Sequence, residues 1–255
     1  MRAGVAKPLV VGNWKMNTTR DEASSLALAI KAAVEPVSSE VEVVVAPPYP
    51  WLTDIAAIVA HSGIELCAQN MHTETGGAYT GEVSPRMLRG LCRYVLVGQY
   101  ERRILFSDKE AIVRRKLQSA QQNGLQPILC VGENADQLDE GLGPFVVAEQ
   151  LEADLEGAAL DDRLVITYEP SWTTMGRVAP PPLSYVGEVL GHIRAKLSSL
   201  YSETVADQTR LLYGGQINPR NIADIAALEG INGVLVGTAS TSAENFSALV
   251  WAFRR

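Results

Sequence analysis

The sequence Tyr94-Val95-Leu96-Val97-Gly98-Gln99-Tyr100-Glu101-Arg102-Arg103 decides how this chain folds. Four apolar residues are followed by a glycine, a polar residue and a Glu-Arg-Arg cluster. A continuous apolar run is typical of a strand that is buried on both faces of a parallel sheet. The polar residues that follow it indicate that this strand delivers Gln99 to a catalytic rim.

Eight runs of this kind recur along the whole chain. They are Pro8–Gly12, Val41–Ala46, Ile64–Ala68, Tyr94–Gly98, Pro127–Val131, Leu164–Tyr168, Arg210–Gly214 and Gly233–Gly237. Longer stretches with helical spacing lie between them, such as Asp21–Val34, Asp108–Gln122, Val146–Gly157 and Tyr185–Tyr201. A strand followed by a helix, repeated eight times with about 30 residues per unit, predicts an α/β fold of the (β/α)8 barrel type.

A doubly wound open sheet is the alternative fold. It rarely needs eight such units, and no Gly-x-Gly-x-x-Gly follows the first strand. No Pro/Gly/Ser-rich linker divides the chain, so we expect residues 1–255 to form a single domain.

Composition limits the classes of function. Among 255 residues, 47% are apolar and 20% are charged, as in soluble globular proteins. The 22 Lys+Arg and 29 Asp+Glu give a net charge of −7, which argues against a nucleic-acid surface. We expect no signal peptide, and no apolar run approaches the roughly 18 residues of a membrane span. The three cysteines (Cys67, Cys92 and Cys130) have no CxxC spacing, so we expect reduced, buried thiols in a cytoplasmic protein.

In a (β/α)8 barrel the chemistry lies at the C-terminal ends of the strands. Polar residues there are partly expected from loop composition, so the residue types have to carry the argument. The strand ends of this chain supply Asn13, Lys15, Gln69, Asn70, Gln99, Cys130, Glu133, Glu169, Gly214, Gly215, Gly237 and Thr238.

Glu169 follows the run Leu164–Tyr168 and precedes a proline. A carboxylate held there can abstract a proton from a carbon next to a carbonyl, provided that a lid excludes water. A solvated glutamate at a strand end is the alternative. The segment Trp172–Ala179 favours the first interpretation, because it has the small residues of a mobile lid between stiff prolines, Pro170 and Pro180.

Lys15 and two glycine-containing loops predict an anion site. An ammonium group at the barrel mouth suits a phosphate or a developing enolate oxygen, although a lone lysine is more often solvated surface. The segments Gly214–Asn218 and Gly237–Ser240 follow the seventh and eighth strands, where barrels commonly bind phosphate through backbone N–H groups. Each segment alone is equally compatible with a tight turn.

Several motifs, in the same order along the chain, resemble the triosephosphate isomerase family. The resemblance runs from Pro8 to the last helix and rests on Asn13–Asn17, Ala68–Met71, Gly77–Pro85, Cys130–Glu133, Tyr168–Trp172 and Tyr213–Gly215. It implies a (β/α)8 barrel that dimerises through the protruding loop Gln69–Pro85. It also implies an enzyme of glycolysis and gluconeogenesis, which moves a proton between adjacent carbons of a triose phosphate through an enediolate, without metal or cofactor.

The resemblance also assigns roles to individual residues by matching position. It implies that Asn13 and Lys15 orient and polarise the substrate, that Glu169 is the base, and that Glu101 supports the lysine. It implies that the substrate phosphate is bound by Gly176, Gly215, Gln216, Gly237 and Thr238.

Four features depart from the family pattern, all of them around the ligand. Gln99 stands in place of the catalytic histidine, beside Tyr100 in place of a serine. Gln216 replaces a serine, Thr238 replaces a glycine, and the lid is one residue shorter at its tip. A glutamine amide donates hydrogen bonds but does not exchange a proton, and losing an acid–base partner typically costs about 10²–10⁴-fold in rate. A single engineered change at Gln99 would leave the other departures unexplained, so the pattern indicates a retuned pocket.

The leading hypothesis is an aldose–ketose isomerase, an intramolecular oxidoreductase, with altered or reduced activity on a triose phosphate or a related compound such as a tetrulose phosphate. One alternative is a non-catalytic or neofunctionalised paralogue that binds a small anionic ligand. A further alternative is β-elimination of phosphate from an unprotected enediolate, which would release methylglyoxal.

Overall fold

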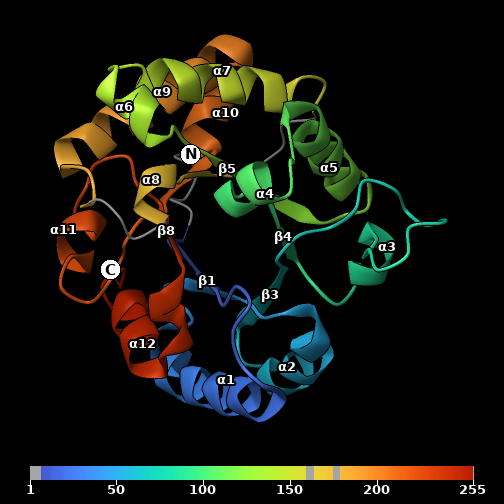
Figure 1. Cartoon of the computed structure of the whole chain (residues 1–255). Helices are drawn as coiled ribbons and strands as arrows, with labels where there is room; N and C mark the ends of the chain where they lie inside the picture. The colour runs from blue at the N-terminus through green and yellow to red at the C-terminus, as the bar shows by residue number, and fades with distance from the viewer. Residues whose placement is uncertain (1–6, 159–163, 175–178, 255) are drawn as a thin grey trace.

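The computed structural model describes residues 7–158, 164–174 and 179–254. Eight parallel strands form a closed barrel in which each strand pairs with its neighbours in sequence and β8 pairs with β1 (Figure 1). The strands are β1 (Leu9–Asn13), β2 (Glu42–Ala46), β3 (Ile64–Ala68), β4 (Tyr94–Val97), β5 (Gln126–Val131), β6 (Val165–Tyr168), β7 (Arg210–Tyr213) and β8 (Gly233–Val236). The predicted (β/α)8 barrel is confirmed, and each predicted strand end lies within one residue of the observed end.

Helices surround the barrel, as Figure 1 shows. They are α1 (Arg20–Val34), α2 (Leu52–Val59), α3 (Pro85–Leu88), α4 (Tyr100–Leu105), α5 (Glu110–Gln122), α6 (Ala135–Asp139), α7 (Gly143–Leu155), α8 (Ser171–Thr174), α9 (Leu183–Leu200), α10 (Glu203–Gln208), α11 (Ile222–Ala226) and α12 (Ala243–Trp251). Short 3-10 helices are η1 (Glu35–Val37), η2 (Tyr49–Trp51) and η3 (Thr238–Thr241). The longest predicted helices are all found, with shifted ends. For example, α7 begins three residues before the predicted Val146, because Pro144 provides a favourable first turn.

The strands are apolar on both faces because they separate two packed layers. Leu9 and Val11 of β1 belong to a cluster inside the barrel, together with Val44 of the neighbouring strand β2. Val10 and Val43 instead pack outward among the helices. Burial on both sides removes the alternation of polar and apolar residues that a half-exposed strand would show.

The loop Gln69–Pro85 leaves the barrel after β3 and projects away from it before α3 (Figure 1). Most side chains between residues 76 and 82 are exposed, and Tyr79 in this stretch is 46% exposed. Cys67, Cys92 and Cys130 are free and buried, as the sequence predicts. Within the described ranges, no helix is both long and apolar enough to span a membrane.

Candidate active site

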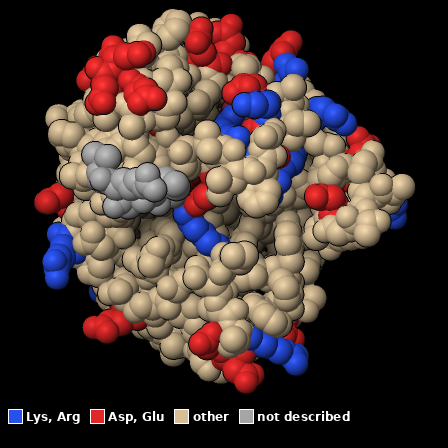
Figure 2. Space-filling model, in the orientation of Figure 1, with Lys and Arg blue, Asp and Glu red and all other residues tan. Residues whose placement is uncertain are grey.

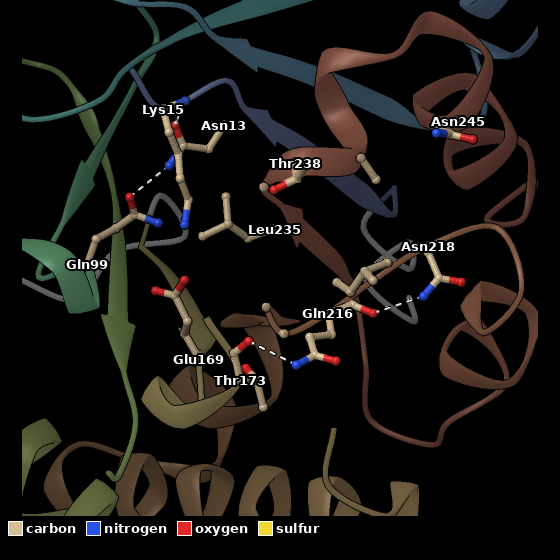
Figure 3. A pocket seen from close by; sticks show the side chains of 15 residues that line it. Asn13, Lys15, Gln99, Glu169, Thr173, Gln216, Asn218, Leu235, Thr238 and Asn245 are labelled. Atoms are coloured by element: carbon tan, nitrogen blue, oxygen red, sulfur yellow. Dashed lines mark hydrogen bonds between the residues drawn. The ribbon is translucent and has the colours of Figure 1, made fainter. Parts of the chain in front are cut away.

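A cavity of about 450 Å³ opens at the C-terminal end of the barrel (Figure 3). The residues that line it are Asn13, Lys15, Gln99, Glu169, Thr173, Gly214, Gly215, Gln216, Ile217, Asn218, Leu235, Gly237, Thr238, Ala239 and Asn245. They come from the ends of five strands and from the segments that follow, because parallel strands of a barrel all end at the same rim.

Most of the predicted site residues meet in this cavity. Those that line it are Asn13, Lys15, Gln99, Glu169, Gly215, Gln216, Gly237 and Thr238. Glu101 does not line the cavity but forms an ion pair with Lys15. Gly176, together with most of the predicted lid tip, lies outside the described residues. Asn245, from α12, lines the cavity although nothing in the sequence marks it as a site residue.

Lys15 is held in an unusual backbone conformation directly after β1. Its φ of 52° lies in the left-handed region, which residues other than glycine adopt only uncommonly. Its N–H donates to Asn13 Oδ1 at 2.9 Å, and its carbonyl accepts from Gln69 Nε2 at 2.8 Å. The side chain reaches into the cavity, and the ammonium group pairs with the Glu101 carboxylate. Lys15 therefore places one fixed positive charge at the barrel mouth.

Gly98 allows β4 to turn and present Gln99 to the cavity. It adopts a φ of +74°, and a Cβ there would lie 2.8 Å from Arg103 Nη2 and 3.1 Å from the Cys130 carbonyl oxygen. The Arg103 guanidinium fills this space and donates to the carbonyls of Gly98 (2.8 Å) and Cys130 (3.0 Å). These bonds tie the ends of β4 and β5 together. Only glycine satisfies both the conformation and the close approach.

The Gln99 carboxamide is 6% exposed and contacts Asn13. Asn13 Nδ2 donates to Gln99 Oε1 at 2.8 Å. The Gln99 amide nitrogen points toward the same part of the cavity as Lys15 Nζ, and the Glu169 carboxylate faces both groups (Figure 3). Two hydrogen-bond donors and one carboxylate thus surround a space at one end of the cavity.

Glu169 is 7% exposed at the end of β6. Its backbone N–H donates to the Val131 carbonyl at 2.8 Å, and a Cβ at Gly132 would lie 2.0 Å from the Glu169 carbonyl oxygen. The pKa of Glu169 is raised from 4.5 to about 7, mainly by burial and also by the nearby negative charge of Glu101, against the opposing charge of Lys15. A carboxylate in this state is a stronger base than a solvated glutamate, so the functional interpretation of Glu169 is favoured.

The other end of the cavity is built from glycines and neutral side chains. Lys15 is the only Lys or Arg among the described lining residues. Gly215 has no room for a side chain, because a Cβ there would lie 2.8 Å from both Thr173 Oγ1 and the Tyr213 hydroxyl. Gln216 lies in the left-handed region (φ 44°), and its Nε2 donates to the Thr173 carbonyl at 3.1 Å. An anion here would be bound by N–H groups and amides instead of by a second cation.

Glu133 does not take part in the cavity, although it follows β5 at the predicted rim. Its side chain is fully buried and accepts from the Tyr168 hydroxyl (2.9 Å) and Trp172 Nε1 (3.3 Å). Its carbonyl accepts from the Ser171 backbone (2.9 Å) and hydroxyl (2.7 Å). Glu133 therefore anchors α8 to the barrel beneath the segment that the sequence predicts to be a lid.

A group of acidic side chains on the surface lies apart from the cavity. Figure 2 shows acidic side chains gathered over α6 and α7, at the outer edge of the same face. No group of three or more His, Cys, Asp or Glu side chains suited to a metal ion occurs in the part of the chain that the structure describes. Lys15, Glu101 and Arg103 are the charged groups that act on the Glu169 carboxylate.

The chain is similar to known proteins over nearly its whole length. A sequence profile described as Triosephosphate isomerase matches residues 8–253. The triosephosphate isomerase of Prosthecochloris aestuarii is 43% identical over 247 residues, which cover 96% of this chain and 98% of that protein. That of Chlorobaculum tepidum is 42% identical over 244 residues, covering 95% and 99%. A crystal structure of triosephosphate isomerase from Bartonella henselae matches with a TM-score of 0.89 and 33% identity, covering 98% of this chain and all of that one. The chain therefore belongs to the triosephosphate isomerase family.

Proposed function

We propose that this protein interconverts a ketose phosphate and an aldose phosphate of triose size or slightly larger, with Glu169 as the base. One observation carries the proposal: a buried carboxylate of raised pKa faces the Lys15 ammonium and the Gln99 amide across one cavity. A base opposite two donors is what proton removal next to a carbonyl requires, because the negative charge develops on the carbonyl oxygen.

The reaction with dihydroxyacetone phosphate then requires two proton transfers at carbon and one between the substrate oxygens. Glu169 removes a proton from C1, and the electron pair of the C–H bond forms the C1–C2 double bond while the C2 oxygen becomes negative. Lys15 and Gln99 stabilise this enediolate. Glu169 returns the proton to C2 while C1 re-forms a carbonyl, and the proton of the C1 hydroxyl passes to the C2 oxygen, which gives glyceraldehyde 3-phosphate.

The rate that this site can reach depends on how the proton is transferred between the two substrate oxygens. An imidazole can exchange that proton, whereas the Gln99 amide has no titratable proton to give. Glu169 must therefore also transfer the proton between the substrate oxygens. We propose an activity that is about 10²–10⁴-fold below that of a site with a general acid at this position.

The phosphate lies at the glycine end of the cavity in this proposal. The cavity reaches Gly215, Gly237 and Thr238, and η3 begins at Thr238. A Cβ at Gly237 would lie 3.4 Å from Lys15 Cε, so this loop approaches the lysine closely. The phosphate and the reacting carbons are then both within reach of Lys15.

A coupled assay with dihydroxyacetone phosphate tests the proposed function. We expect slow formation of glyceraldehyde 3-phosphate that is abolished without the protein. Release of methylglyoxal without aldose would contradict isomerisation and support β-elimination of phosphate.

The pH dependence of kcat/KM should report the raised pKa of Glu169. The base must be deprotonated, so we expect kcat/KM to rise with pH through about 7 and then level off. The Glu101→Gln substitution should move this rise to lower pH, because it removes a negative charge near Glu169 and frees Lys15 from its ion pair. A pH profile that is the same with and without the substitution would contradict this account of the base.

We further propose a cytoplasmic homodimer that contacts its partner through Gln69–Pro85. The loop projects from the barrel, Tyr79 is 46% exposed, and Met16 beside the active-site lysine is 97% exposed. Exposed apolar side chains mark an association surface where they form one contiguous patch, and the proposed dimer requires that they do so here. Light scattering should give twice the 27.5 kDa mass of the chain, and a monomer mass at micromolar concentration would contradict the proposal. The free, buried thiols fit a reducing compartment.

A further inference from the structure

The orientation of the Gln99 amide is fixed by a chain of hydrogen bonds that starts at a backbone N–H. The Lys15 N–H donates to Asn13 Oδ1 at 2.9 Å, and a backbone N–H can only donate. Asn13 must therefore turn its NH2 group the other way, where Nδ2 donates to Gln99 Oε1 at 2.8 Å. With its oxygen occupied, Gln99 presents its NH2 group to the cavity (Figure 3).

The first donor of this chain is held rigidly. Lys15 has a φ of 52°, and its carbonyl accepts from Gln69 Nε2, which also donates to the Ala46 carbonyl, each at 2.8 Å. The Lys15 N–H shares its peptide group with the Trp14 carbonyl, which accepts from Asn17 Nδ2 at 2.6 Å. Turning this N–H away from Asn13 would break that bond as well.

The opposite amide orientation is disfavoured because both side chains are buried, Asn13 being 2% exposed and Gln99 6%. Rotating Gln99 alone would place its NH2 group against the NH2 group of Asn13. Rotating both would place the Asn13 NH2 group against the Lys15 N–H. Either change leaves buried donors facing each other, which is costly for groups with so little exposure.

We propose that Asn13 is a positioning residue for Gln99. Because Asn13 accepts from the Lys15 N–H, it must donate to the Gln99 oxygen, and this turns the Gln99 NH2 group toward the substrate oxygen. This inference rests on the proposed function. It follows that the site selects a ligand with an acceptor oxygen, a carbonyl or an enediolate, at this point. A glutamine needs such a partner because its amide offers a donor or an acceptor according to its rotation. A neutral imidazole has only one donor, and the partner of its other nitrogen decides which one it is.

Neutron diffraction from deuterated crystals tests the orientation without any need for turnover. It distinguishes ND2 from oxygen directly. We expect the two deuterons of Gln99 to face the cavity and those of Asn13 to face Gln99. A map with the Gln99 oxygen toward the cavity would overturn the inference, whether or not the protein is an isomerase.

A double-mutant cycle tests the functional consequence. Asn13→Asp keeps the shape of the side chain but removes its donor, so Gln99 must turn its NH2 group toward the new carboxylate and offer oxygen to the substrate. We expect kcat to fall about tenfold or more with little change in KM, the scale of one lost hydrogen bond in the transition state. In the Gln99→Leu background the same substitution should cost less than about threefold, because leucine has no amide for residue 13 to orient.

The cycle separates positioning from a simple charge effect, because the new carboxylate is present in both backgrounds. Equal losses in the two backgrounds would overturn the inference. The carbonyl stretch of bound dihydroxyacetone phosphate should also move to higher frequency in Asn13→Asp, which a purely structural role of Asn13 would not cause. Asn123→Asp is the matched control, since Asn123 Nδ2 donates to the Ser119 carbonyl (2.8 Å) at the end of α5, outside the cavity. Absence of turnover in the unsubstituted protein would contradict the proposed function, and the neutron map would still decide the orientation.

Discussion

Replacing Glu169 by glutamine is expected to lower kcat by about 10³–10⁴-fold, with little change in KM. The side chain keeps its size and its place at the end of β6, but it can no longer accept a proton. No other carboxylate lines the described part of the cavity, so the carbon-bound proton has no alternative acceptor. Steady-state kinetics with dihydroxyacetone phosphate measure the effect. A loss of less than tenfold would contradict the assignment of the base.

The same substitution should stabilise the fold above neutral pH. The pKa of Glu169 is raised from 4.5 to about 7, so the folded state favours the protonated form. The contribution of this group to stability is therefore complete below about pH 4.5 and is lost as the pH rises through 7. At pH 8 we expect Glu169→Gln to gain roughly 1–3 kcal/mol, and the gain should disappear at acidic pH. A melting temperature that falls at pH 8 would mean that the loss of activity reflects misfolding.

An exposed carboxylate provides the control for both effects. Glu152 on α7 is exposed and pairs with Lys196, away from the cavity. The Glu152→Gln substitution makes the same chemical change, and we expect both kcat and the melting temperature to stay within experimental error, as is usual for surface ion pairs.

Replacing Gln99 by histidine is expected to raise kcat by about 10²-fold. Position 99 lies directly after Gly98 and faces both Lys15 and Glu169, so a side chain there reaches the substrate oxygens. An imidazole would donate to the enediolate as the amide does, and it would also exchange the proton between the two oxygens. The gain should appear in kcat, because the interaction with the intermediate strengthens more than the interaction with the ground state.

Gln99→Leu distinguishes a donor from a mere space-filling side chain at the same position. It removes the hydrogen bond and should lower kcat by about 10-fold or more. The order of activity should therefore be histidine, glutamine, leucine. If histidine gave no gain, the limit on the rate would lie elsewhere in the pocket, at Gln216, Thr238 or the shortened lid, and the proposed role of Gln99 would be wrong.

The fold could be predicted from the sequence because each strand and helix has a local pattern of apolar residues. Parallel strands covered on both faces are continuous apolar runs, and the eight runs are separated by segments long enough for crossover helices. The placement of Lys15, Gln99 and Glu169 around one cavity follows from the same argument, since all strand ends of a barrel point to one rim.

The contacts inside the site could not be predicted, because side-chain directions depend on tertiary neighbours. Glu133 follows a strand end as Glu169 does, one residue further on, yet it bonds to the Tyr168 hydroxyl and the Trp172 indole and does not line the cavity. Asn13 and Gln99 are 86 residues apart in sequence, and no local pattern links them. Their hydrogen bond depends on the backbone of Lys15, which propensity alone would place in another conformation.

The opposite end of the barrel gives a second example. Arg210 forms an ion pair with Glu42 at 2.6 Å and donates to the Tyr94 hydroxyl at 2.8 Å, and that hydroxyl donates to Glu42 at 2.6 Å. In the sequence these residues are single polar or aromatic positions at the starts of β7, β2 and β4. Closure of the barrel brings them together. The ion pair and hydrogen bonds between them allow charged groups to be buried there.

The most direct test of the account is proton NMR of dihydroxyacetone phosphate incubated with the protein in D₂O. If Glu169 carries the proton between C1 and C2 and exchanges it with solvent, deuterium should enter C2 of the glyceraldehyde 3-phosphate and C1 of the recovered ketose. Both signals should be lost in Glu169→Gln. Absence of deuterium from both compounds, at protein concentrations high enough to detect a 10⁴-fold impaired enzyme, would contradict the claim that this site performs enediolate chemistry.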